Sequence, residues 1–530
     1  MFPATISDVI PIITSTKLFL YGAIGSLLFV ILAFSLNRLT TWEYSIPNEV
    51  QWIDRRKEAF SYLRAKARSL VRNKENVLEA YFKFNKLGNA AACAVAFGRP
   101  LLLLPPTFIR WIVDQPESII SLDPIHDDFH AFLGDGLIGD HTVQELLRRE
   151  LTLNLDKLTP EINEEIVAAL DDVLGNSPEW KTTSLADDLK TIIARTSNRV
   201  FMGKDLCRNE DYISTAKGLA MVVMPETVLQ DLVPQILKGP LSRITRVFNN
   251  IYAMKRITSH LLPVVRQRYI DVKNVFDGSG DKEQLPDSLL TWMVQKSIRR
   301  GESSANIDKV LVARIGMVNL AAIETTTAAM TKSILDLVTL GDEGGFLAAV
   351  QEEALAVLEG CNFEPDKNDV SKLSLTENAI KESLRLQVAF PGLMRQVVNP
   401  KGVTLDNGLH VPYGTRVGVS AAGIHVDDSV YENATTYNPG RFMVIDLDAR
   451  GKPNPLWKGT ENYLAFGLGR RSCPGRWYVT DQLKLTVAHI FSKYEIKFEK
   501  AAKKTSALRK ILPGAPQDHV MIRRRPKVAL

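Results

Sequence analysis

Five residues near the C-terminal end have types and a spacing that suit a metal-binding thiolate. Phe466, Gly469, Arg471, Cys473 and Gly475 form the pattern F-x-x-G-x-R-x-C-x-G. Glycines on both sides of the cysteine leave room for a close approach to its sulfur. The apolar spacing from residue 476 onward predicts a helix that begins directly after the cysteine. Cys473 is therefore a candidate metal ligand, although a lone cysteine is more commonly a small buried hydrophobic residue.

The surroundings of this cysteine are electropositive. Arg470, Arg471 and Arg476 are its neighbours in the chain, and a helix N-terminus stabilises negative charge. Both effects favour the thiolate, which is the form of cysteine that binds metals and acts as a nucleophile.

A second group that could do chemistry lies in the middle of a long apolar helix predicted over residues 306–340. Asn306 is the predicted N-cap and Gly341 ends the pattern. The central residues 321–327 read A-A-I-E-T-T-T. A glutamate in such a helix is costly unless it is satisfied, so Glu324 and the adjacent Thr325 are either a satisfied polar cluster of the core or an acid and a hydroxyl that handle protons.

The bulk composition is that of an ordinary globular protein with a large core. The 530 residues are 45% hydrophobic and 24% charged, and the net charge of +5 is small for this length. That charge does not suggest a nucleic-acid partner. The four cysteines are scattered and include no C-x-x-C pair, which favours a reducing compartment.

The N-terminal region predicts a membrane anchor. Residues 18–36 contain no charge and as a helix would span about 28 Å, close to the thickness of a bilayer core. A cleaved signal peptide is the alternative, but the run is longer than an ordinary signal and no A-x-A-like site follows it. The excess of Lys and Arg after the run places the body on the cytoplasmic side. We therefore expect an anchor over residues 1–39, a linker over 40–50 and a catalytic domain over 51–530.

Other elements follow from local patterns. A buried strand is predicted where R-P-L-L-L-L-P-P occurs, within residues 98–106, and a hairpin sheet over 403–419. Helices are predicted over residues 51–87, 141–155 and 189–207.

The loop around Cys473 closely resembles the haem-binding loop of the cytochrome P450 family. The resemblance implies that Cys473 is the axial haem ligand and that Arg471 contacts a haem propionate. An axial thiolate favours O–O cleavage. Residues 321–327 resemble the family's oxygen-activation motif, with Glu324 as the acid and Thr325 as the hydroxyl. Ala322 stands where the family usually has glycine, which leaves the shape of the oxygen groove open.

Further marks occur in the family's order. Glu382, Arg385 and Arg441 match a buried structural network, and Arg395 matches a second propionate contact. A basic residue on the helix over 141–155 often touches a propionate, but the family's usual tryptophan is absent there. The roles of His141 and Arg148 therefore stay open, and Arg148 and Arg149 are expected on a solvated face.

The resemblance implies a mainly α P450 fold, a helical haem domain with small β-sheets, tethered by one transmembrane helix to the endoplasmic reticulum with its catalytic domain in the cytosol. The implied function is oxidation of a lipophilic small molecule with O2 and NADPH-derived electrons. The expected partners are NADPH-cytochrome P450 reductase, with cytochrome b5 as a second candidate. The sequence looks most like fungal enzymes that make terpenoids and other secondary metabolites.

Two alternatives remain at this point. An O2-independent haem-thiolate isomerase or dehydratase would not need the threonine, and a haem-binding sensor would need neither an acid–alcohol pair nor a lipophilic cavity. Glu324 and Thr325 count against both. The substrate and the site and number of oxidations are not fixed by the sequence.

Overall fold

The structure is a computed structural model, and the residues that it describes are 46–58, 61–95, 99–127, 137, 139–220, 255–302, 304–341, 343–499 and 519–526. The predicted anchor over residues 1–39 lies outside the described residues.

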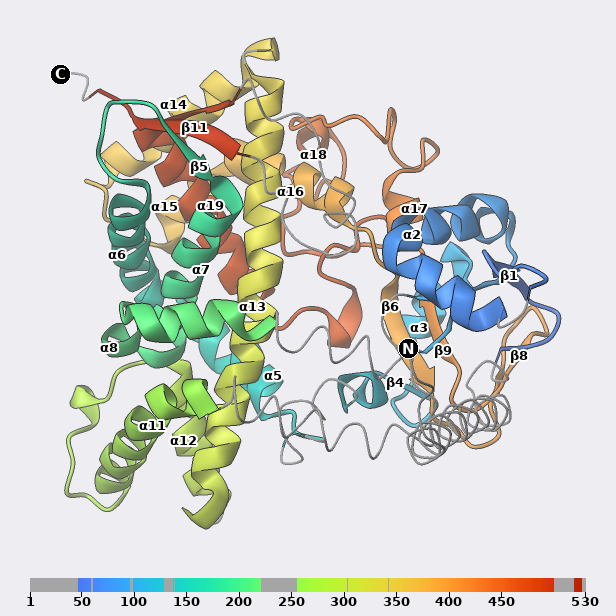
Figure 1. The fold of residues 1–530 in the computed structure, drawn as a ribbon, viewed down its shortest axis with the longest axis horizontal. Helices are drawn as coiled ribbons and strands as arrows, with labels where there is room; N and C mark the ends of the chain where they lie inside the picture. The colour runs from blue at the N-terminus through green and yellow to red at the C-terminus, as the bar shows by residue number, and fades with distance from the viewer. Residues whose placement is uncertain are drawn as a thin grey trace, which may run out of the picture.

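Helices make up most of the described chain (Figure 1). They are α2 (Ser61–Lys83), α3 (Ile109–Asp114), α5 (Thr142–Leu146), α6 (Leu155–Leu174), α7 (Leu185–Met202), α8 (Lys204–Cys207), α11 (Lys255–Phe276), α12 (Leu289–Arg299), α13 (Ser304–Leu340), α14 (Phe346–Gly360), α15 (Lys367–Lys372), α16 (Ser374–Gln387), α17 (Ala421–His425), α18 (Arg441–Val444) and α19 (Arg476–Lys493). The strands are β1 (Gln51–Ile53), β2 (Ala91–Cys93), β3 (Leu101–Leu104), β4 (Ile120–Ser121), β5 (Lys181–Ser184), β6 (Gly392–Val397), β7 (Val403–Thr404), β8 (His410–Val411), β9 (Arg416–Val419), β10 (Tyr494–Phe498) and β11 (His519–Arg524).

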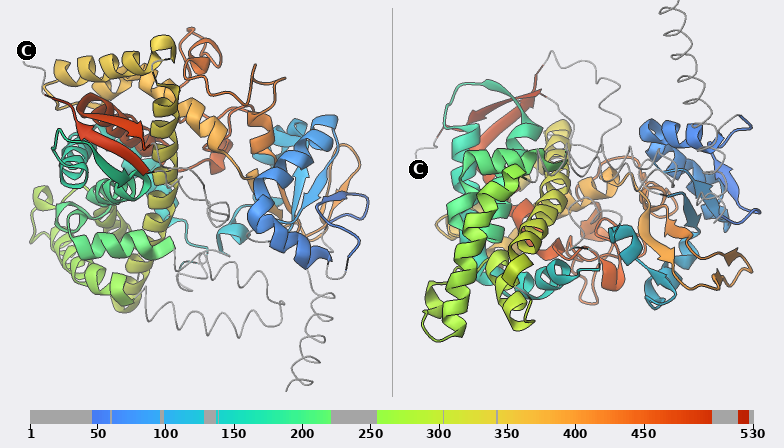
Figure 2. Two further views of the ribbon diagram at one scale, coloured as in Figure 1. Left: turned by 45° about the horizontal axis from the view of Figure 1, so that its top comes forward. Right: turned by 60° about the horizontal axis from the view of Figure 1, so that its bottom comes forward.

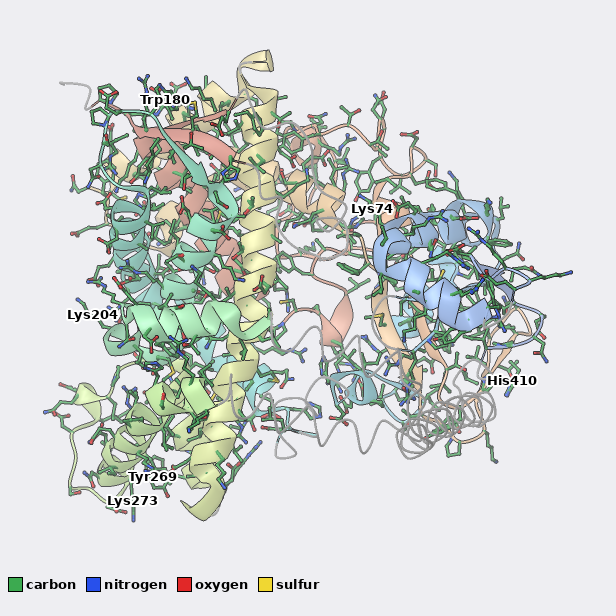
Figure 3. The ribbon with its side chains drawn as sticks, in the orientation of Figure 1. Lys74, Trp180, Lys204, Tyr269, Lys273 and His410 are labelled. Atoms are coloured by element: carbon green, nitrogen blue, oxygen red, sulfur yellow. The ribbon has the colours of Figure 1, made fainter. Side chains whose placement is uncertain are left out.

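The molecule has a helical part and a part built on a six-stranded sheet. That sheet has the order β1-β2-β3-β9-β6-β4. Helix α2 packs against β1 and β2, and α17 packs against α2 (Figure 2). Smaller sheets are β10-β11-β5 and β7-β8. Lys204, where α8 begins, and His410 on β8 mark opposite sides of the molecule (Figure 3). The mainly α architecture with small sheets is confirmed.

The structure corrects one of the two predicted β elements. The strand within residues 98–106 is confirmed as β3, and all four of its leucines are buried. The hairpin over 403–419 is only partly right: β7 pairs with β8, but β9 lies between β3 and β6 in the large sheet. All four residues of β9 are buried, which suits a central strand and not an exposed hairpin.

The long helix is confirmed as α13, which has 37 residues and so measures about 55 Å. It begins at Ser304, so Asn306 lies inside the helix and is not its N-cap. α13 packs against α7, α11, α16 and α19, and its apolar residues belong to the main hydrophobic core. Among the described residues it is the one helix long and apolar enough to cross a membrane, and 61% of that apolar window is buried. We therefore interpret it as a core helix.

Several predicted helices are divided in the structure. The segment 51–87 begins with β1 before α2. The segment 141–155 is α5 followed by one π-helical turn, η5 (Leu147–Leu151). The segment 189–207 is divided into α7 and α8 at Gly203, whose φ of 92° is accessible mainly to glycine.

Candidate functional site

The loop that carries Cys473 is folded tightly. A short 3-10 turn, η9 (Gly469–Arg471), precedes the cysteine, and α19 begins three residues after it. The amide of Cys473 donates to the carbonyl of Phe466 over 2.8 Å. Gly469 has a φ of 73°, and a Cβ there would lie 2.5 Å from Cγ1 of Val113, so only glycine fits.

Gly475 is different from Gly469. No described atom lies within 4 Å of a Cβ built on Gly475. Packing within the described protein therefore does not explain this glycine, and its predicted role in leaving room beside the sulfur stays a prediction.

The electrostatics of the Cys473 thiol differ from the expectation. Burial raises its pKa above the ordinary value, and this outweighs the lowering by the amides of Gly475 and Arg476 and by the charges of Arg476 and Arg148. Arg470 and Arg471 are not among the main contributors. The protein alone therefore keeps the thiol protonated, and a bound metal ion would have to drive its ionisation.

Three arginines lie around this loop. Arg471 forms ion pairs with Glu117 at 2.7 Å and with Asp123 at 3.3 Å. Arg395 on β6 is only 6% exposed, and its guanidinium donates to the carbonyl of Met394 over 2.7 Å. In the part of the chain that the structure describes, no ion pair joins Arg395 to a carboxylate.

Arg148 was expected on a solvated face, and this was wrong. Its guanidinium donates to the carbonyl of Ser472 over 3.3 Å, directly beside Cys473, because η5 faces the cysteine loop. Arg149 is exposed as expected, with 81% of its side chain accessible. His141 Nε2 lies 3.5 Å from Asp123 Oδ2, and Asp123 is also a partner of Arg471.

The opposite wall is the middle of α13. Ala321 and Thr325 are exposed at the centre of a helix that is otherwise packed on several sides, so no described side chain covers this face. The Thr325 hydroxyl donates to the carbonyl of Ala321 over 2.7 Å. Glu324 points elsewhere and forms an ion pair with Lys190 of α7. The structure therefore does not join the Glu324 and Thr325 side chains.

The predicted structural network is assembled in the core. Glu382 and Arg385 are both fully buried and are joined by two hydrogen bonds of 2.7 Å. Arg441 donates to the same carboxylate over 3.0 Å. His425 extends the network, since it lies 3.0 Å from the carbonyl of Arg385 and its Nε2 accepts from the amide of Leu464 over 2.9 Å. These bonds connect α16 to the segment that leads into the cysteine loop.

Comparison with known proteins identifies the family. The sequence model of the family described as Cytochrome P450 matches residues 141–520, which is more than half of the chain. The chain belongs to the cytochrome P450 family. It is 81% identical over 504 residues to cytochrome P450 monooxygenase gloO of Glarea lozoyensis, covering 95% of this chain and 97% of the relative. It is 53% identical over 516 residues to cytochrome P450 monooxygenase ecdH of Aspergillus rugulosus, covering 97% and 99%.

The chain is thus a P450 monooxygenase, and P450s carry haem with a cysteine thiolate on the iron and act on small molecules with electrons from redox partners. The described residues fit this cofactor. A buried arginine needs an anion, and haem propionates would meet that need at Arg395. Arg148 and Arg471 would bind the same haem propionates. Cys473 would bind the iron, and Phe466, Gly469 and Gly475 would form the loop around it.

Sequence reasoning missed four residues in or beside this site: Lys190, His425 and the two acids that pair with Arg471, which are Glu117 and Asp123. Lys190 is far from Glu324 in the chain and ordinary in type, so no local signal marks it. His425 is likewise visible only through the contacts of its ring. Arg148 was considered in the sequence analysis but was assigned to a solvated face, whereas it contacts the carbonyl of Ser472.

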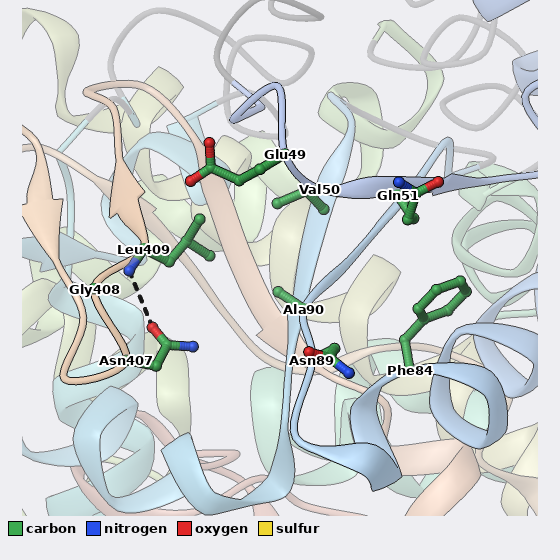
Figure 4. Close-up of a pocket in the computed structure, with 9 residues that line it drawn as sticks. All are labelled: Glu49, Val50, Gln51, Phe84, Asn89, Ala90, Asn407, Gly408 and Leu409. Carbon is green, nitrogen blue, oxygen red and sulfur yellow. Dashed lines mark hydrogen bonds between the residues drawn. The ribbon is translucent and has the colours of Figure 1, made fainter.

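A groove of about 570 Å³ lies elsewhere, between the start of the described chain, β2 and the β7–β8 loop (Figure 4). It is lined by Glu49, Val50, Gln51, Phe84, Asn89, Ala90, Asn407, Gly408 and Leu409. None of the predicted site residues lines it, so we do not assign it to the haem site.

Proposed function

We propose that this P450 is a membrane-anchored monooxygenase that inserts one oxygen atom from O2 into a lipophilic secondary metabolite of a fungus, with terpenoids as the first class to test. The observation that carries the oxygenase assignment is the uncovered face of α13, where Thr325 lies next to Ala321. The monooxygenase names of relatives in two fungi support it. The terpenoid class rests on sequence resemblance.

The haem supplies the activation of O2 and the transfer of one oxygen atom to the substrate. The chain supplies the proton handling on α13. The Thr325 hydroxyl now donates to Ala321, so it must rotate away from that carbonyl to donate into the open face. Lys190 holds the Glu324 carboxylate at the same helix turn. Water at this turn would return a proton to the Thr325 hydroxyl after the hydroxyl has donated one.

The electrons are proposed to come from NADPH-cytochrome P450 reductase, with cytochrome b5 as a second candidate donor. The sequence contains no glycine-rich dinucleotide fingerprint that follows a strand. Near the cysteine loop, Arg470 and Arg149 are exposed, whereas Arg476 is bound to the carbonyl of Cys473 over 2.8 Å. Exposed arginines favour an acidic docking surface on the donor, and reduction should slow as salt is added.

The anchor over residues 1–39 is tested by deletion. The truncated protein should move from the membrane fraction to the supernatant and keep its haem, because every site residue lies after residue 116. If the truncated protein still sedimented with membranes, a second membrane-binding surface would have to exist.

The function is tested with the full-length protein in membranes, purified reductase, NADPH and an extract of a host that lacks the gene. Under 18O2 we expect a new product that contains one 18O atom, measured by mass spectrometry. A product that forms without NADPH and O2, and that carries no 18O when 18O2 is present, would favour the isomerase or dehydratase alternative. If no extract yielded a labelled product, the proposed function would be wrong.

A further inference from the structure

Two carboxylates are built into the arginine cluster beside the cysteine loop. Strand β4 pairs antiparallel with β6, with Ile120 opposite Val397 and Ser121 opposite Gln396. Arg395 is the residue before Gln396, so this pairing fixes β4 and the residues on both sides of it next to Arg395. Glu117 and Asp123 lie at the two ends of this segment.

The carboxylates are held by specific contacts. Glu117 Oε1 accepts from Arg471 Nε over 2.7 Å, and Asp123 Oδ1 lies 3.3 Å from the same guanidinium. The Ser121 hydroxyl donates to Glu117 Oε2 over 2.8 Å and accepts from the amide of Asp123 over 3.1 Å. Ser121 therefore fixes the positions of Glu117 and Asp123 relative to β4. Both carboxylates contact the guanidinium of Arg471.

Glu117 and Asp123 both place negative charge near Arg395 and Arg471. Burial alone would raise the pKa of Glu117, but the hydrogen bonds from Arg471 and Ser121 and the charges of Arg471 and Arg395 hold it below the ordinary value. Glu117 is thus a carboxylate at neutral pH. The carboxylate of Asp123 also acts on Arg395 and Arg471. Two negative charges therefore offset part of the charge of Arg395 and Arg471.

We propose that Glu117 and Asp123 are positioning residues that lower the reduction potential of the haem by holding Arg471 and offsetting the charge of the arginine cluster. Adding an electron to the iron is less favourable when fixed negative charge lies nearby. The side chains of Glu117 and Asp123 are 42% and 33% exposed, so solvent screens part of this effect. The inference rests on the haem of the family and is independent of the proposed substrate and anchor.

The competing arrangement is that haem propionates replace both acids on Arg471. In that case Glu117 and Asp123 would turn toward solvent, where their charges would be screened. Removal of either charge would then leave the potential of the haem unchanged, so the two arrangements differ in a measurable quantity.

The test is a spectroelectrochemical titration of the purified, haem-loaded protein. Glu117→Gln and Asp123→Asn should each raise the midpoint potential, so that the ferrous-to-ferric ratio at a fixed potential increases by roughly two- to fivefold. Glu117→Asp keeps the charge and should stay near the wild-type value. Glu495→Gln is the matched control, because Glu495 is also paired with an arginine, at 2.7 Å, but in the three-stranded sheet.

Each variant is first checked for haem content and for the spectrum of the reduced carbon monoxide complex. If Glu117→Gln loses its haem, Asp123→Asn carries the test. Wild-type potentials in both charge-removing variants would overturn the proposal. A shift in Glu117→Asp as large as that in Glu117→Gln would also overturn it, since packing and not charge would then be responsible. A failure to find product in extracts would leave this result unaffected.

Discussion

Lys190 of α7 forms an ion pair with Glu324 of α13, with 18% and 29% of the two side chains exposed. The ion pair with Lys190 directs the Glu324 carboxylate away from the Thr325 hydroxyl, although the two residues are adjacent in the sequence. The Thr325 hydroxyl donates to the helix carbonyl of Ala321 over 2.7 Å, while the Glu324 carboxylate is directed toward α7. If Glu324 and Thr325 handle protons as proposed, we expect proton transfer at this turn to depend on Lys190 of α7.

The first prediction concerns this pair. Lys190→Gln and Glu324→Gln should each increase the peroxide released per NADPH, because each breaks the same contact. The double variant should be no worse than the more severe single variant, since residues that act as a unit are not additive. Measurement of peroxide and product against NADPH consumed gives the answer. If the two effects simply added, Lys190 and Glu324 would act independently.

The second prediction concerns the hydroxyl. Thr325→Ala removes the donor and leaves a good helix former, so haem and substrate binding should persist. Product per NADPH should fall by about tenfold or more, as for loss of a proton-transfer group, with peroxide in its place. Thr327→Ala is the control, because Thr327 is 4% exposed and points about 200° around the helix from Thr325. Equal coupling in Thr325→Ala and wild type would revive the O2-independent alternative.

The sequence was sufficient where a feature depends on neighbouring residues. The helix after Cys473 and the length of α13 follow from local spacing, so they could be predicted. The partners of Glu324 and Arg471 could not, because Lys190, Glu117 and Asp123 are brought in by contacts between distant segments. The protonation of Cys473 was misjudged for a related reason: neighbouring charges are visible in the sequence, but burial is not.

The third prediction concerns the fully buried network of α16. Glu382→Gln removes the carboxylate that Arg385 and Arg441 share, which leaves buried cations without a counter-charge and should cost about 3–5 kcal/mol. Because large proteins often unfold irreversibly, the readout is the half-life of the haem-thiolate spectrum at a fixed temperature. Glu79→Gln, which breaks the surface pair with Lys83, should change it little. Similar half-lives in the two variants would contradict this account.

The fourth prediction is a pH dependence. Burial, with smaller effects from Lys493 and Arg524, lowers the pKa of His489 to about 3, and its Nε2 lies 2.6 Å from Asn163 Oδ1. Below the ordinary value of about 6.5 the unfolded chain binds a proton that the folded chain does not, so stability falls as pH falls. This should cost about 1.4 kcal/mol per pH unit between pH 6 and 4.

His489→Gln should remove that contribution. Denaturant midpoints followed by circular dichroism at pH 7 and 5 should differ less in the variant than in the wild type. If both proteins lost the same stability between these pH values, His489 would not be the group responsible.

The most direct test of the account is the spectrum of the reduced carbon monoxide complex of Cys473→Ser. The wild type should show the red-shifted Soret band of a thiolate-bound haem, and Cys361→Ser, which changes another partly exposed free cysteine, should keep it. Cys473→Ser should lose that band, because serine is similar in size but a poor ligand for the iron. A red-shifted band that persisted in Cys473→Ser would show that Cys473 is not the haem ligand.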